Sequence, residues 1–185
     1  MFVVRAGQCT ALVPLTAVLR EIHDALSRDV EEAIAARKAS GAPLIGEATG
    51  VAIGPLPAFE PIEGAKDVSI SVRAVPLDDV STLSMIIGER VPDGDVAARV
   101  AHERRTMTAM REFIRGALGS LVGLVDDDKK PVPIGDGKRK LTDEEISTLE
   151  GAGGQFFFAL FRACRHFQGL TSDEKKAFGA QAPST

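Results

Sequence analysis

The chain has 185 residues, of which 44% are hydrophobic and 26% are charged, and its formal net charge is −4. This length suits one domain, or one domain with a small appendage, and the apolar content is too high for a disordered chain. The net negative charge argues against a general nucleic-acid-binding protein, while a local basic face remains compatible with it.

The N-terminal part, residues 1–65, is expected to combine short strands, one helix and an irregular arm. Apolar runs at residues 2–4 and 11–13 predict two short strands. Apolar residues then recur at steps of three and four, which predicts an amphipathic helix that begins near Thr16 and ends before Gly41. The stripe consists of Leu15, Val18, Leu19, Ile22, Leu26, Val30, Ala33 and Ile34. Residues 41–65 are rich in glycine and proline, which excludes a regular helix and predicts an ordered loop or extended arm.

The remaining part, residues 66–185, is expected to open with a strand followed by helices. Residues 68–75 alternate between apolar and polar side chains, which predicts a half-buried strand ended by Pro76. A short helix should follow at residues 77–87, with an aspartate as its cap.

The longest helix is predicted at residues 95–121, after a turn at Pro92–Asp95. Its apolar stripe comprises Val96, Val100, Met107, Met110, Phe113, Ile114, Ala117, Leu118 and Leu121, and its arginines are Arg99, Arg104, Arg105, Arg111 and Arg115. These arginines have two interpretations. They pair with glutamates on the same helix and with solvent, or they contact an acidic partner or a phosphate backbone, together with Lys138, Arg139 and Lys140.

The last third of the chain contains a polar turn and two capped helices. Residues 124–134 predict a small hairpin around an acidic turn, and residues 135–140 a second loop. Thr142 with Glu145, and Thr171 with Glu174, match the helix capping box. Between them, a helix at residues 154–168 is apolar over a wide arc, so more than one neighbour must cover it.

No pattern in the chain indicates catalysis, a metal or a cofactor. His102-Glu103 begins a zinc-protease motif but lacks the second histidine, and Cys164 and His166 face different directions on one helix. Asp126–Asp128 lacks the alternating ligands and central glycine of a calcium loop. We therefore expect a protein that is not an enzyme and uses no cofactor.

Two cysteines far apart, Cys9 and Cys164, predict neither a disulfide framework nor a zinc site, and favour reduced thiols. Residues 1–5 lack the pattern of a signal peptide, and no apolar run reaches the roughly 18 residues of a membrane span. A cytoplasmic protein that does not enter membranes is expected.

One family resemblance rests on three segments, Val68–Leu77, Phe113–Ile134 and Leu141–Leu149. An alternating strand and helix are followed by a helix that ends in Gly-Leu-Val-Asp-Asp-Asp-Lys-Lys-Pro-Val-Pro, and then by the helix start Leu-Thr-Asp-Glu-Glu. In this the chain resembles phage tail assembly proteins of the tail assembly chaperone type. The resemblance implies a small acidic protein of the host cytoplasm or the assembled virion, which engages phage structural proteins or itself.

Together these patterns predict an α+β fold, mostly helical, with a small antiparallel sheet or hairpin. The expected function is non-enzymatic protein–protein interaction in the assembly of phage or phage-like tails, as a chaperone or as a small structural subunit. Apolar side chains of the phenylalanine-rich helix would be the anchors. The candidate partner-binding residues are Phe156, Phe158, Phe161, Arg104, Arg105 and Arg111. The alternative is a small nucleic-acid-contacting protein that uses the arginine-rich helix 95–121.

Overall fold

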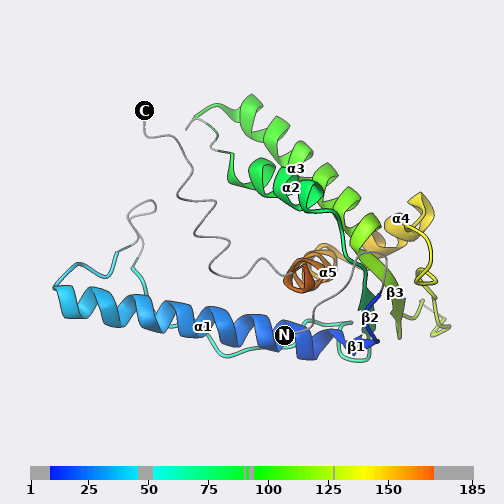
Figure 1. Cartoon of the computed structure of the whole chain (residues 1–185), viewed down its shortest axis with the longest axis horizontal. Coiled ribbons are helices and arrows are strands. Elements are labelled where there is room, and N and C mark those ends of the chain that lie inside the picture. The colour runs from blue at the N-terminus through cyan, green and yellow to red at the C-terminus, as the bar shows by residue number, and fades with distance from the viewer. Residues whose placement is uncertain (1–8, 46–51, 90, 92–93, 127, 169–185) are drawn as a thin grey trace.

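The computed structural model describes residues 9–45, 52–89, 91, 94–126 and 128–168, and within them the chain has the predicted α+β fold (Figure 1). The helices are α1 (Leu15–Ser40), α2 (Leu77–Gly88), α3 (Val96–Ala117), α4 (Asp143–Gly151) and α5 (Gly154–Phe167). The strands are β1 (Val13–Pro14), β2 (Ser69–Val72) and β3 (Leu118–Val122).

The sheet is antiparallel and has the order β1-β2-β3. Ile70 in the central strand lies opposite Val13 on one side and Leu121 on the other. The predicted strand at residues 68–75 is confirmed but shorter, and the strand predicted at 11–13 appears as β1. The strand predicted at residues 2–4 lies outside the described residues. Strand β1 lies before position 66, and β2 and β3 lie after it, so both parts of the chain contribute strands to one sheet.

The helix predicted at residues 95–121 is wrong at its C-terminal end, because α3 stops at Ala117 and the chain continues directly as β3. Two leucines at helical spacing, Leu118 and Leu121, are both buried within the strand. They can share a face because the pairing with β2 is irregular beside Gly119, between Ser71 and Val72. A Cβ on Gly119 would lie 2.7 Å from the Cys9 sulfur, so a side chain there would clash. The expectation that this helix is the longest is wrong as well, because α1 has 26 residues and α3 has 22.

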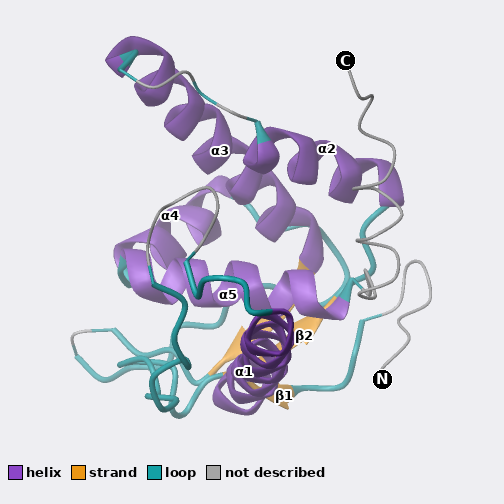
Figure 2. Cartoon of the chain, turned by 90° about the vertical axis from the view of Figure 1, so that its left-hand side faces the viewer, coloured by secondary structure: helices purple, strands orange, loops and turns teal. Residues whose placement is uncertain are grey.

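Helix α5 occupies the centre of the molecule, between α1 on one side and α3 and α4 on the other (Figure 2). Its buried residues cover a wide arc and include Phe156, Phe157 and Phe161, so the predicted cover by several neighbours is confirmed. The Phe161 and Phe113 rings meet edge to face, with centroids 5.6 Å apart. After the helix, the Gln168 amide accepts from the Val75 N–H at 2.8 Å and donates to the Arg73 carbonyl at 2.7 Å. Gln168 thereby ties the end of α5 to the chain that leaves β2.

The helix ends follow local chemistry in most places. Gly41 ends α1 in the left-handed region at φ 69°. Thr142 and Glu145 form the predicted capping box of α4, while the box predicted at Thr171 lies outside the described residues. The aspartate cap predicted for α2 is wrong, because Pro76 is the N-cap and makes no side-chain cap. Asp78 and Asp79 lie instead in the first turn of α2, where carboxylates favour the positive end of the helix dipole.

The hairpin predicted at residues 124–134 is present as a short excursion after β3. The Val132 N–H donates to the Leu124 carbonyl at 2.8 Å, and Leu121 forms a bridge with Ile134. Within the turn, Asp126 Oδ1 accepts from the Asp128 and Lys130 amides at 3.0 and 2.8 Å. Among the described residues, no helix combines the length and the apolar character that crossing a bilayer requires.

Candidate protein-binding site

Residues 52–65 of the glycine- and proline-rich arm run back along α1 in the opposite direction, and α1 contacts both these residues and the start of the arm (Figure 1). Arg37 donates to the Pro43 and Ile45 carbonyls near the far end of α1, each at 3.0 Å. At the near end, Thr16 Oγ1 donates to the Ala65 carbonyl at 3.1 Å. Side chains of a regular helix therefore satisfy backbone carbonyls of a segment that lacks a regular ladder.

The middle of the arm is held by His23. Its Nε2 lies 2.9 Å from the Pro57 carbonyl, which can only accept, so Nε2 carries the proton. The His23 ring also meets the Phe59 ring edge to face, with centroids 5.6 Å apart. The guanidinium of Arg20 lies 5.5 Å from the centroid of Phe59. Phe59 thus occupies a fixed position between two side chains of α1, which shapes the adjacent surface.

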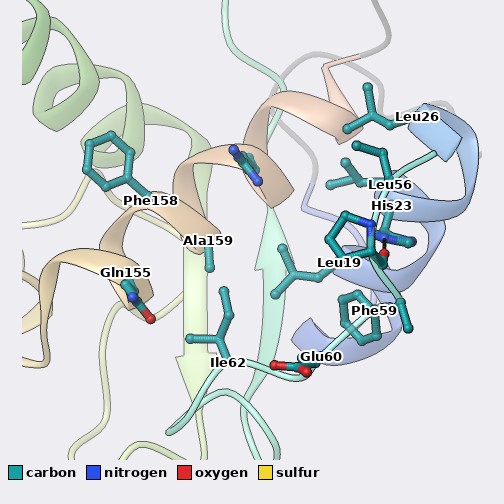
Figure 3. A pocket seen from close by; sticks show the side chains of 14 residues that line it. Leu19, His23, Leu26, Leu56, Phe59, Glu60, Ile62, Gln155, Phe158 and Ala159 are labelled. Carbon is teal, nitrogen blue, oxygen red and sulfur yellow. Dashed lines mark hydrogen bonds between the residues drawn. The ribbon is translucent and has the colours of Figure 1, made fainter. Parts of the chain in front are cut away.

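A groove of about 620 Å³ lies between α1, the arm and α5 (Figure 3). Its lining is predominantly apolar, and its polar groups are His23, Glu60, Gln155 and Arg162. Helix α1 contributes Leu19, Ile22, His23 and Leu26, the arm contributes Leu56, Pro57, Ala58, Phe59, Glu60 and Ile62, and α5 contributes Gln155, Phe158, Ala159 and Arg162. The volume falls within the range of ordinary ligand-binding clefts.

Three large apolar side chains in the groove remain open to solvent. Phe158 is 44% exposed, Leu26 is 47% exposed and Leu56 is 40% exposed. Figure 3 shows Phe158 on α5 at one side of the groove and Leu26 and Leu56 at the other. Fully burying a side chain of this size is worth about 1.5–3 kcal/mol, and less than half of each remains exposed, so covering the rest is worth about 1 kcal/mol apiece. The groove therefore favours an apolar segment.

The structure separates the three predicted phenylalanine anchors. Phe158 lines the groove, whereas Phe156 and Phe161 are 3% and 5% exposed and belong to the core. Sequence reasoning missed the contributions of Leu26, Leu56, Phe59 and Arg162. The apolar residues of Leu56–Phe59 within a glycine- and proline-rich stretch are a signal that could have found two of them, whereas nothing in the sequence singles out Leu26 and Arg162.

The predicted arginines do not form one continuous basic surface, because most of them bind carboxylates of other elements. Arg105 pairs with Glu89 at 3.1 Å, and Arg111 pairs with Glu150 at 2.8 Å. Arg115 pairs with Asp143 of α4, and this hydrogen bond raises the pKa of the guanidinium further. The remaining two, Arg99 and Arg104, make no ion pair with any residue that the structure describes.

Helix α4 is the main target of these pairs. In addition to Arg111 and Arg115 from α3, Arg139 from the preceding loop binds Glu145 through two hydrogen bonds of 2.7 and 2.9 Å. The basic residues of α3 and of the loop thereby fasten α4 to the rest of the fold.

The remaining reactive side chains do not meet in the groove. Cys164 is fully buried, and burial raises the pKa of its thiol to about 12, so the thiol stays protonated. His166 faces Glu21 of α1, with Nε2 and Oε1 3.4 Å apart. Across the described ranges, no cluster of three histidine, cysteine or acidic residues could hold a metal ion.

Comparison of the chain with protein-family models, with curated proteins and with solved structures found no match. The groove itself presents an apolar surface with a few polar groups.

Proposed function

We propose that this protein is a non-enzymatic protein-binding component whose groove receives an apolar segment of a partner protein. The observation that carries the proposal is the exposure of Phe158, opposite Leu26 and Leu56, in an apolar groove of about 620 Å³. Aromatic side chains, phenylalanine among them, are enriched in the buried cores of protein–protein interfaces. The polar groups His23, Glu60, Gln155 and Arg162 would orient the bound segment.

The proposed setting is the assembly of phage or phage-like tails, with a tail structural protein as the partner. This part of the proposal rests on the resemblance of Val68–Leu77, Phe113–Ile134 and Leu141–Leu149 to tail assembly proteins. The groove supplies the physical part, because transient cover of an apolar segment is what a chaperone or an assembling subunit requires.

Photo-crosslinking from the groove tests this function. A benzoylphenylalanine replaces Phe158 in cells that express the protein with its genomic neighbours, and mass spectrometry identifies the adducts. We expect one discrete partner adduct, and we expect Leu26→Glu to abolish it because a carboxylate would lie in the apolar groove. The matched control carries the photoreactive residue in place of Val122, which is 54% exposed on β3 and lies outside the groove.

Absence of an adduct at position 158 would remove the proposal, as would an adduct that Leu26→Glu leaves unchanged. Identification of the adduct as a protein unrelated to tails would retain the binding function and overturn its setting.

A further inference from the structure

Helix α3 carries an apolar stripe that is covered over only half its length. Apolar residues at positions 96, 100, 107, 110 and 114 recur at steps of four, seven, three and four, which is the spacing of helices that pair along a seam, and Glu103 lies at the edge of this row. The C-terminal members Met110 and Ile114 are buried in the core. The N-terminal apolar members Val96, Val100 and Met107 are 60%, 39% and 36% exposed. Figure 2 shows this half of α3 extending beyond α4 and α5.

The two flanks of the uncovered stripe differ in character. One flank carries Arg99 and Glu103, one helical turn apart and opposite in charge. Neither side chain makes an ion pair with any residue in the part of the chain that the structure describes. The other flank carries Arg104, which is exposed and makes no ion pair with any described residue, and Ala97, whose small side chain lets another helix approach closely.

We propose that the uncovered half of α3 binds the same half of α3 in a second copy of the chain, in antiparallel orientation. A two-fold axis near Ala101 places Val96 against Met107 of the second copy and brings the two Val100 side chains together. In an antiparallel pair the same flank of each helix faces the other. Arg99 of each copy therefore faces Glu103 of the other.

This reciprocity favours a second copy over an unrelated partner. A two-fold interface must be complementary to itself. When two copies of this flank run antiparallel, the basic residue of each lies opposite the acidic residue of the other, so the flank meets this condition. The residues from Val96 to Met107 span about 18 Å of helix, so the interface is small and the dimer should dissociate in the micromolar range. The surface is separate from the groove, so this inference does not depend on the proposed function.

Sedimentation equilibrium of the full chain at concentrations from about 1 to about 300 μM, which bracket the expected dissociation constant, tests for the dimer. Arg99→Glu and Glu103→Arg each turn two attractive pairs into repulsive ones and should weaken dimerisation about tenfold. The double variant Arg99→Glu/Glu103→Arg restores opposite charges across the axis and should dimerise within about threefold of the unchanged protein.

A second pair of variants tests the apolar seam. Val100→Asp should abolish the dimer, whereas Met85→Asp should leave it unchanged, because Met85 is 76% exposed on α2. Circular dichroism establishes that each variant retains its helices. A chain that stays monomeric at every concentration would overturn the inference, as would a dimer that Val100→Asp does not weaken. Failure of the double charge variant to restore association would point to a different arrangement and would overturn it equally.

Discussion

Glu145 binds the loop that precedes α4 to the first turn of that helix through one carboxylate. It accepts two hydrogen bonds from Arg139, one from the Gly135 amide at 2.9 Å and one from the Thr142 amide at 2.7 Å. The Arg139 guanidinium, with help from the two amides, lowers the pKa of Glu145 from an ordinary 4.5 to about 2. The charged form of Glu145 therefore stabilises the folded state.

Glu145→Gln should lower the free energy of unfolding at pH 7 by about 1–2 kcal/mol, because the charge-assisted bonds and the helix cap are weakened. The folded pKa lies below the unfolded pKa, so this stabilisation is complete above pH 4.5 and is lost as the pH falls toward 2. Urea unfolding at pH 7, 5 and 3 measures the difference between variant and parent.

The matched control is Glu144→Gln, in the same turn of α4 but with an exposed side chain. It should change stability by less than about 0.5 kcal/mol at each pH. A difference for Glu145→Gln that does not shrink on acidification would contradict the role assigned to the carboxylate.

Within α5, neighbouring phenylalanines serve different purposes. Phe157 is 1% exposed in the core and Phe158 is 44% exposed in the groove. Phe157→Ala should therefore lower the free energy of unfolding by about 3–5 kcal/mol, because it leaves a cavity. Phe158→Ala should cost less than about 1 kcal/mol while removing partner binding. Chemical denaturation of both variants provides the comparison, and equal destabilisation would show that Phe158 is a packing residue.

At the scale of elements, the helices could be predicted because their signals are local. The stripe of α1, the capping box of α4 and the wide apolar arc of α5 each lie within one short stretch of sequence. Strand β3 could not be predicted in this way. Leu118 and Leu121 continue the stripe of α3, and only pairing with β2, about 50 residues earlier in the chain, decides that they are extended.

The groove was equally hidden from local patterns. Its wall at residues 56–62 has no regular structure, and its position depends on single contacts such as that of His23 with the Pro57 carbonyl. Phe158 could be selected from the sequence as an aromatic residue off the main stripe. The same reasoning also selected Phe156, which is buried. The sequence could not separate the two residues, because the positions of α3 and α4 around α5 decide which side of the helix remains open.

In the molecule as a whole, α1 and the α2–α3 hairpin extend away from the sheet, and α5 lies between their bases (Figure 1). The groove lies on the α1 side of α5, and the exposed stripe lies on the α3 side. The two surfaces share no residue, so binding at one should be independent of binding at the other.

This independence can be measured. Leu26→Glu should leave the sedimentation behaviour unchanged within about twofold while removing the crosslink from position 158. Val100→Asp should do the reverse, abolishing self-association and preserving the crosslink. Loss of both properties in either variant, with the helices intact by circular dichroism, would mean that the two surfaces are coupled.

The absence of a loop between α3 and β3 has a mechanical consequence. Ala117 ends a helix about 33 Å long and Leu118 begins a strand hydrogen-bonded into the sheet, so no flexible loop separates the helix from the sheet. A force applied to α3 near Val96 would be transmitted to the C-terminal end of the helix, where Arg111 and Arg115 form ion pairs with α4. We expect α2 and α3 to move together under such a force, and the ion pairs between α3 and α4 to break before helix α3 unfolds.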